Sequence, residues 1–271
     1  MTQKTKKEMS FLDHLEELRW LLIKSVLAIL IGGTIAFVFS DFIFSEVLFG
    51  PKNANFVTYR FFCEVAQYFN LEDQSICNAT LDLKIQNTNM GGQVSFMIWT
   101  CITAGFIIGF PYILWEIWKF ISPALYQNEK KYARAFVLIS SLLFFIGVLF
   151  GYYIIVPLSV YFFATFSAST EIINEINLES YTSLLKTSVI ACGIIFELPI
   201  IIYFLSKLGL VTPQFLRKYR KYALVIVLIV AAIITPPDVA SQVIVSIPIM
   251  ILYEISIFIS AYVNKKQQLN P

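Results

Sequence analysis

The feature that most constrains this sequence is a series of long stretches that carry almost no charge. A helix needs roughly 20 mostly apolar residues to cross a hydrocarbon core about 30 Å thick, and most of these stretches reach that length. Overall, 58% of the residues are hydrophobic and 14% are charged, whereas about 25% are charged in soluble domains. This pattern predicts an all-α integral membrane protein and excludes a soluble enzyme, a disordered chain and a nucleic-acid binder.

Prolines divide the longest stretches into separate predicted helices. Pro157 is expected to end a helix near Val156, and Thr235-Pro-Pro-Asp238 marks a tight turn between the last two helices. The result is six predicted transmembrane helices in one membrane domain, residues 1–271, with a short fifth and sixth helix. The predicted spans are about 20–40, 94–115, 135–156, 187–206, 222–234 and 241–262. At about 1.5 Å per residue the fifth is roughly 20 Å long, well short of the bilayer core.

Positive charges lie mainly on one side of this six-span arrangement. Most of the 20 Lys and Arg residues fall in the N-terminal segment, the second-to-third and fourth-to-fifth connections, and the C-terminal tail. Because basic residues concentrate in cytoplasmic segments, both termini are expected in the cytoplasm. The acid-rich residues 10–19 precede the first apolar stretch and no small-residue cleavage site follows it, so we expect a retained first span rather than a cleavable signal peptide.

The largest extramembrane segment, residues 41–92, is expected on the outer side and contains Cys63 and Cys77. The compartment outside the cytoplasm is oxidising, so these two residues either form a disulfide or remain free thiols. Cys101 and Cys192 lie within predicted spans and are interpreted as packing residues. No cysteines are spaced for zinc and the chain has a single histidine, so neither a metal nor a cofactor is expected.

Residues 10–19 are predicted to form an amphipathic helix at the cytoplasmic surface before the chain turns into the first span. Ser10 and Asp13 approximate a capping box, and leucines at helical spacing make one apolar face. The remaining faces are acidic, and Glu17 is one of these acids. Two interpretations stay open: the acids bind a basic ligand, or they form a solvated face with local ion pairs, for example to Arg19.

The cytoplasmic connection 118–129 is a second candidate surface. It contains aromatic residues and a proline-broken loop, and it ends in Glu129. The alternatives are an aromatic belt at the membrane interface and a local ion pair between Glu129 and Lys130 or Lys131.

Glu197 is the most unusual residue, because it lies inside a predicted span and is followed by Pro199. A carboxylate at the centre of a span costs about 2.5–3.5 kcal/mol on insertion scales and is expected to face a cavity or a partner. Gln242 and Thr235 are candidates for the same polar pocket. Glu254, a second acid in an apolar stretch, is expected to snorkel or to form an ion pair. The sequence has no nucleotide-binding loop and no catalytic motif, so an enzyme is not expected.

Four segments, in chain order, resemble the signature motifs of TatC, the multi-spanning subunit of the twin-arginine protein translocase. These segments are His14-Leu-Glu-Glu17-Leu-Arg19, Phe120-Ile-Ser-Pro-Ala-Leu-Tyr-Gln-Asn-Glu129, Phe196-Glu197-Leu-Pro199 and Thr235-Pro-Pro-Asp238-Val-Ala-Ser-Gln242. The resemblance extends over about residues 10–262. It departs from the family around residues 60–85, which form a longer outer segment.

The resemblance implies a concave, glove-like bundle in the bacterial cytoplasmic (inner) membrane. It further implies that the chain binds twin-arginine signal peptides of folded cargo at the cytoplasmic face. Single-span TatA/TatB-type partners would act with it, in a complex that contains several copies of the chain. Transport would draw on the proton-motive force without nucleotide.

The resemblance also implies site residues. Glu17 and Glu129 match the family positions for the arginine pair, Phe120 would belong to the same patch, and Arg19 would hold the local ion-pair geometry. A second group would line the concave side and contact partners: Glu197, Pro199, Asp238 and Gln242.

The residues leave two alternatives to this function open. The first is a proton-coupled secondary transporter of small molecules in which Glu197 titrates, although no internal repeat of the kind found in many such transporters is evident. The second is a purely structural membrane subunit, which would leave the cytoplasmic acids unexplained.

Overall fold

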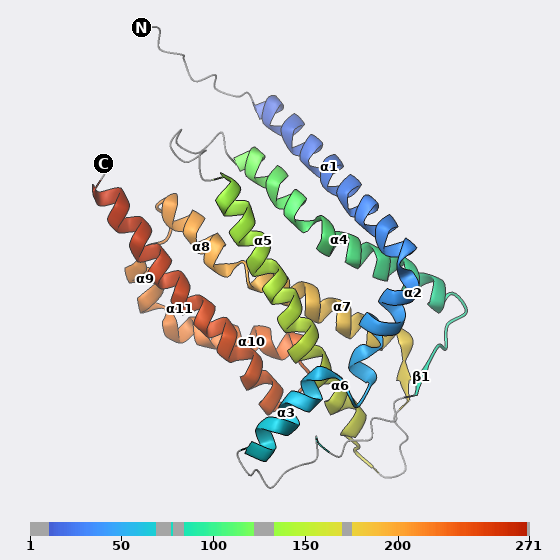
Figure 1. Cartoon of the computed structure of the whole chain (residues 1–271). Helices are drawn as coiled ribbons and strands as arrows, with labels where there is room; N and C mark the ends of the chain where they lie inside the picture. Colours follow the sequence, from blue (N-terminus) through green and yellow to red (C-terminus); the bar gives the residue numbers. More distant parts are fainter. Residues whose placement is uncertain (1–10, 69–76, 78–83, 122–132, 170–174, 270–271) are drawn as a thin grey trace. The chain divides into compact units, whose positions relative to one another are not determined.

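A computed structural model describes residues 11–68, 77, 84–121, 133–169 and 175–269, and these are almost entirely helical (Figure 1). The helices are α1 (Phe11–Val38), α2 (Ser40–Phe42), η1 (Ile43–Leu48), η2 (Gly50–Lys52), α3 (Val57–Tyr68), α4 (Gly92–Ile121), α5 (Ala133–Phe150), η5 (Gly151–Ile155), α6 (Val156–Thr165), α7 (Leu178–Ile195), α8 (Leu198–Lys207), α9 (Pro213–Lys218), α10 (Arg220–Ile234) and α11 (Val239–Leu269). Two short strands, β1 (Ile85–Gln86) and β2 (Ile176–Asn177), pair in parallel.

Within the described residues, five helical segments are long and apolar enough to cross a membrane. They are His14–Val38, Gly92–Ile121, Arg134–Thr165, Leu178–Lys207 and Val239–Lys266. Many of their large apolar side chains are exposed, Leu22 and Leu138 among them. Soluble proteins rarely expose apolar surface on this scale, whereas lipid covers it in a membrane. The chain is therefore an all-α membrane protein, as the sequence predicts.

The predicted short fifth helix coincides with α10, which has 15 residues and a length of about 22 Å. The sixth helix was wrongly predicted to be short, because α11 has 31 residues. Pro248 lies inside α11 without ending it, since a proline removes only one backbone hydrogen bond and neighbouring groups can compensate. The polar residues near the C-terminus continue the same helix to Leu269.

Two further helix boundaries differ from the prediction. Helix α1 runs without a break from Phe11 to Val38, so the amphipathic segment and the first span are one helix. No proline or glycine occurs in it before Gly32, and nothing local interrupts the hydrogen-bond ladder.

The third span does not end near Val156, because α5 continues through the π-helical turn η5 into α6. Pro157 cannot donate a hydrogen bond to the carbonyl of Tyr153 one turn earlier. The hydroxyl of Thr58, on α3, donates to that carbonyl instead. A tertiary contact thus satisfies the group that the proline leaves unpaired, and the helix continues to Thr165.

The chain divides into two compact units, each built from two segments. The first unit consists of Met1–Phe39 and Cys101–Ser141, and the second of Ser40–Thr100 and Leu142–Pro271. Helix α1 and the part of α4 from Cys101 onward belong to the first unit, together with the start of α5.

Glycines bring α1 and α4 into backbone contact within the first unit. A Cβ atom on Gly105 would lie 2.3 Å from the carbonyl oxygen of Ile29, and one on Gly32 would lie 2.8 Å from that of Gly105. Gly109, one turn further along α4, faces Ala28 at an ordinary contact distance of 3.5 Å. Small residues allow such close approach in membrane helices, where dispersion rather than the hydrophobic effect drives association.

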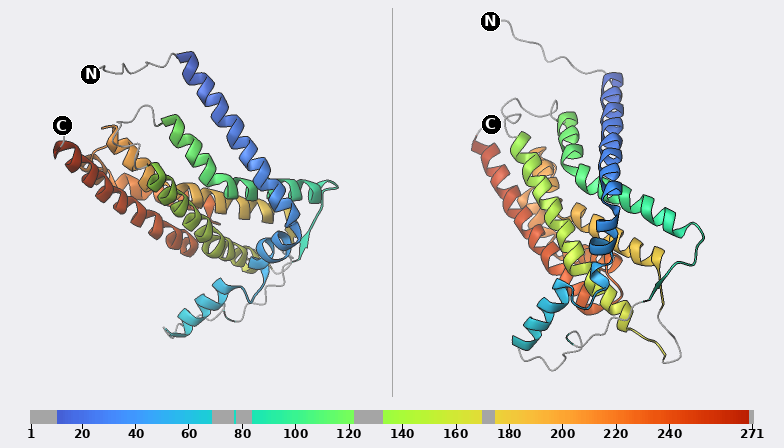
Figure 2. Two further views of the ribbon diagram at one scale, coloured as in Figure 1. Left: turned by 45° about the horizontal axis from the view of Figure 1, so that its top comes forward. Right: turned by 45° about the vertical axis from the view of Figure 1, so that its right-hand side comes forward.

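The core of the second unit lies where α7, α8, α10 and α11 meet, and Figure 2 shows α11 running beside α8 and α10. Its fully or nearly fully buried side chains include Ile155, Ala231 and Val245. Helix α7 approaches η5 closely, because a Cβ on Gly151 would lie 2.9 Å from the carbonyl oxygen of Ser188.

Three tyrosines attach the irregular segment 47–51 to helices of the second unit. Tyr152 donates to the carbonyl of Val47 and Tyr181 to that of Leu48, each at 2.7 Å. The Tyr59 hydroxyl lies 2.9 Å from the carbonyl oxygen of Pro51 and 3.0 Å from that of Pro157, and it shares its proton between them. Burial raises the pKa of Tyr59 above its usual value. These bonds satisfy carbonyls that the π and 3-10 turns leave outside a regular α-helical ladder.

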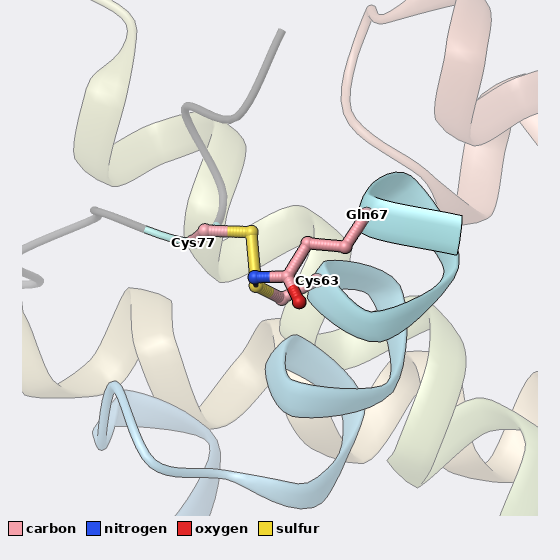
Figure 3. Close-up of a disulfide and its surroundings, with 3 residues drawn as sticks. All are labelled: Cys63, Gln67 and Cys77. Atoms are coloured by element: carbon pink, nitrogen blue, oxygen red, sulfur yellow. Dashed lines mark hydrogen bonds between the residues drawn. A yellow bond between two sulfur atoms is a disulfide. The ribbon is translucent and has the colours of Figure 1, made fainter. Parts of the chain in front are cut away.

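A disulfide joins Cys63 on α3 to Cys77, with the two sulfur atoms 2.12 Å apart, and the side chain of Gln67 lies against it (Figure 3). Of the two alternatives that the sequence left open, the structure has the bridged one. Disulfides persist outside the reducing cytoplasm.

Replacing Cys63 with serine is expected to destabilise the segment that contains α3 by about 3 kcal/mol, because the bridge closes a loop of 14 residues that would otherwise gain chain entropy on unfolding. Thermal unfolding of the purified protein with and without reductant measures this. The Cys101→Ser variant, which leaves the bridge intact, is the control. Equal midpoints for Cys63→Ser and the unreduced parent protein would show that the bridge contributes nothing.

Candidate functional site

A cavity of about 260 Å³ lies between α1 and the C-terminal half of α4, inside the first unit. It is lined by Glu17, Trp20, Leu21, Lys24, Glu116, Lys119 and Phe120. Helical spacing explains the lining, since Glu17, Leu21 and Lys24 share one face of α1, and Glu116 and Phe120 share one face of α4. Two of the predicted signal-peptide residues, Glu17 and Phe120, are thereby brought together.

Glu116 is the charged centre of this cavity, and the sequence analysis missed it. Its side chain is 4% exposed. Lys24 Nζ lies 3.2 Å from Glu116 Oε2, and Lys119 Nζ lies 2.6 Å from Glu116 Oε1. Each carboxylate oxygen therefore holds one ammonium group, which offsets part of the cost of burying the charge.

A sequence signal for Glu116 existed. The second charge-free stretch ends at Trp115, immediately before this acid. An acid at the border of a span, with Lys119 at i+3 and Lys24 inside another apolar stretch, indicates an intramembrane ion pair. The sequence alone does not indicate that the lysine 92 positions away is the partner.

The aromatic ring of Phe120 stacks on His14, with ring centroids 4.3 Å apart. This contact joins the cavity end of α4 to the first turns of α1. Arg19 lies on α1 and is exposed, and it does not line the cavity. Glu129, the other predicted acid, lies outside the described residues.

The second predicted group centres on Glu197, which is buried at a break between α7 and α8. The backbone forms a turn at Phe196 and Glu197, where the Glu197 N–H donates to the carbonyl of Ile194, three residues earlier, and Pro199 occupies the first turn of α8. Pro199 has no amide hydrogen for the turn before it, so the break falls where the sequence predicts a kink. An intramembrane carboxylate is thus placed at a discontinuity in a membrane-spanning segment.

Asp238 and Gln242 have local structural partners. Asp238 Oδ2 accepts from the backbone N–H of Ser241 at 2.8 Å, and this hydrogen bond lowers the pKa of Asp238 at the N-terminus of α11. The amide of Gln242 donates to the carbonyl of Leu228 at 3.0 Å, which ties α11 to α10. Their expected contact with partners stays a prediction.

Glu254, for which the sequence left snorkelling and pairing open, forms an ion pair. Its Oε2 lies 2.6 Å from a guanidinium nitrogen of Arg220 at the start of α10. Both side chains are at least a third exposed, so this surface pair is worth at most about 1 kcal/mol.

Long apolar helices, a charged cavity at the end of two of them and a buried acid at a helix break define a multi-pass integral membrane protein with polar sites inside its bundle. Comparison with known families identifies the particular one. The model of the Sec-independent protein translocase protein (TatC) family matches residues 13–248, so the chain belongs to the TatC family and is a protein translocase subunit.

Relatives support the assignment over nearly the full length. The chain is 45% identical to the TatC of Blattabacterium sp. subsp. Periplaneta americana over 262 residues, 97% of this chain and 98% of the relative. It is 35% identical to the TatC of Aquifex aeolicus, over 96% of this chain and 98% of the relative. Among solved structures, a crystal structure of the twin arginine translocase receptor TatC in DDM aligns with a TM-score of 0.70 at 36% identity, over 90% of this chain and 98% of that one.

Proposed function

We propose that this translocase subunit recognises twin-arginine signal peptides of folded proteins at its cytoplasmic face. The observation that carries the proposal is the cavity between α1 and α4, which both Glu17 and Phe120 line. A pair of guanidinium groups requires carboxylate acceptors, and arginine binds carboxylates through two parallel hydrogen bonds. Glu129 is the second proposed acceptor, and Arg19 is proposed to hold the ion-pair geometry around Glu17.

The proposed topology has six spans with both termini in the cytoplasm of a bacterium, so that the cavity faces the compartment where signal peptides are made. Two observations support it. Basic residues concentrate in the segments assigned to the cytoplasmic side. The Cys63–Cys77 disulfide belongs to the part of the sequence that connects the first predicted span to the second, as expected for a segment outside the reducing compartment.

The second proposed site involves the buried Glu197 at the α7–α8 break, together with Pro199, Asp238 and Gln242. A polar group on a single-span TatA/TatB-type partner, or the apolar part of a signal peptide, would enter near this acid. Assembly of several copies with such partners, and the use of the proton-motive force, belong to the same proposal. The family transports proteins, which favours this account over small-molecule transport driven by titration of Glu197.

Binding of synthetic signal peptides tests the proposal directly. The purified chain in lipid nanodiscs should bind a twin-arginine peptide roughly tenfold tighter than its twin-lysine version, because lysine cannot form the bidentate bond. Glu17→Ala should remove most of this preference. Glu16→Ala deletes the neighbouring exposed acid, which does not line the cavity, and serves as the matched control. Equal affinities for both peptides in the parent protein would refute the recognition site.

A further inference from the structure

We propose that Glu116 is a third, latent acceptor for the arginine pair, and that Lys24 and Lys119 make its cavity selective for arginine over lysine. This inference rests on the proposed function and adds a specificity mechanism to it. It starts from a charge balance, because the cavity lining contains two acids, Glu17 and Glu116, and two lysines. A cavity of zero formal charge attracts an incoming dication weakly unless a resident cation leaves.

The two lysine side chains are exposed enough to move from the cavity into water, whereas the Glu116 side chain is buried. The Glu116 side chain is 4% exposed, whereas those of Lys24 and Lys119 are 43% and 51% exposed. Long, half-exposed ammonium side chains can rotate into water at small cost. Lys119 also has an alternative partner in place, since its Nζ lies 5.6 Å from the ring centroid of Trp115.

The geometry at Glu116 favours exchange by a guanidinium. Both carboxylate oxygens of Glu116 already accept a hydrogen bond, one from Lys24 and one from Lys119. A single guanidinium presents a planar fork that can engage both oxygens at once, so one arginine replaces two monodentate partners and releases two ammonium groups to water. An incoming lysine exchanges one ammonium for another and gains no hydrogen bond. The resident lysines thus act as competitors that arginine displaces and lysine does not.

The mechanism predicts opposite effects for the acid and its lysines. Glu116→Gln should weaken binding of the twin-arginine peptide roughly tenfold, the scale of one hydrogen bond to a charged group. Lys119→Gln and Lys24→Gln should strengthen binding of the twin-lysine peptide more than that of the twin-arginine peptide, so that the arginine preference narrows to about threefold or less. Lys265→Gln removes a positive charge from the exposed end of α11 and should leave the preference unchanged.

The experiment uses the full chain in lipid nanodiscs, fluorescent twin-arginine and twin-lysine peptides, and a thermal midpoint for every variant to verify folding. Loss of twin-arginine binding in Lys119→Gln as large as in Glu116→Gln would mean that the three residues form a purely structural ion cluster, and the inference would be wrong. If Glu17→Ala removes binding of the twin-arginine peptide while both lysine variants keep the full arginine preference, the proposed function is supported and this inference is wrong. If the parent protein binds the two peptides equally well, both the proposed function and this inference are wrong.

Discussion

Replacing Gly105 with alanine is expected to separate α1 from α4 and to prevent the first unit from packing. The new methyl group would lie 2.3 Å from the carbonyl oxygen of Ile29 and 2.5 Å from the backbone nitrogen of Gly33. Both are backbone atoms, which cannot rotate away as a flexible side chain can. Overpacking of this kind costs about 1–3 kcal/mol or more. The thermal midpoint and the yield of monodisperse protein in detergent measure the effect.

Gly109→Ala is the matched control for this prediction. It adds the same methyl group to the same helix one turn away, where the nearest atoms lie 3.5 Å from the new Cβ. Alanine is favoured over glycine inside a helix by about 1 kcal/mol, so Gly109→Ala should be neutral or stabilising. Similar destabilisation by both variants would show that close backbone contact at Gly105 is not what holds the two helices together.

Glu197→Gln is expected to reduce export of twin-arginine cargo roughly tenfold or more while the protein still inserts and accumulates. The substitution keeps the size of the side chain and removes the charge that a partner group would hydrogen-bond, an interaction worth about 1.5–3 kcal/mol. Insertion should not suffer, because a carboxylate costs about 2.5–3.5 kcal/mol at the centre of a span. Transport of a reporter protein across the membrane and co-purification of the proposed single-span partners are the measurements.

Glu254→Gln controls for the loss of any acid from an apolar segment, since Glu254 forms a partly exposed ion pair with Arg220. Export at the parent level in this variant, together with loss in Glu197→Gln, would assign the effect to the α7–α8 break. Unchanged export and partner association in Glu197→Gln would remove the proposed partner contact and leave the buried acid with a structural role.

Much of the candidate site was accessible from the sequence, because it depends on local spacing. Glu17 falls on the same helical face as Leu21 and Lys24 whatever the rest of the chain does. The cavity itself was not predictable, since it forms between two helices whose lining residues, 17–24 on α1 and 116–120 on α4, are far apart in the sequence. Glu116 was missed for the same reason, because its partner Lys24 is 92 positions away.

The prolines show the same difference between what the local sequence predicts and what tertiary contacts decide. The Pro236-Pro237 pair ends α10 as expected, because a double proline cannot continue a helix. Pro157 fails to end its helix, because the hydroxyl of Thr58 bonds the carbonyl that the proline leaves free. A proline's consequence therefore depends on a tertiary partner that the local sequence does not reveal.

The sequence by itself determined that this chain is a helical membrane protein, roughly where its helices run and which family it resembles, because hydrophobic length and helical period are local properties of the chain. The tertiary structure alone decided that α5 continues into α6, that α11 is long, that Cys63 pairs with Cys77, and that two lysines enclose Glu116. The first and the last of these depend on contacts between distant residues, because Thr58 bonds the carbonyl of Tyr153 and Lys24 reaches Glu116 from 92 positions away.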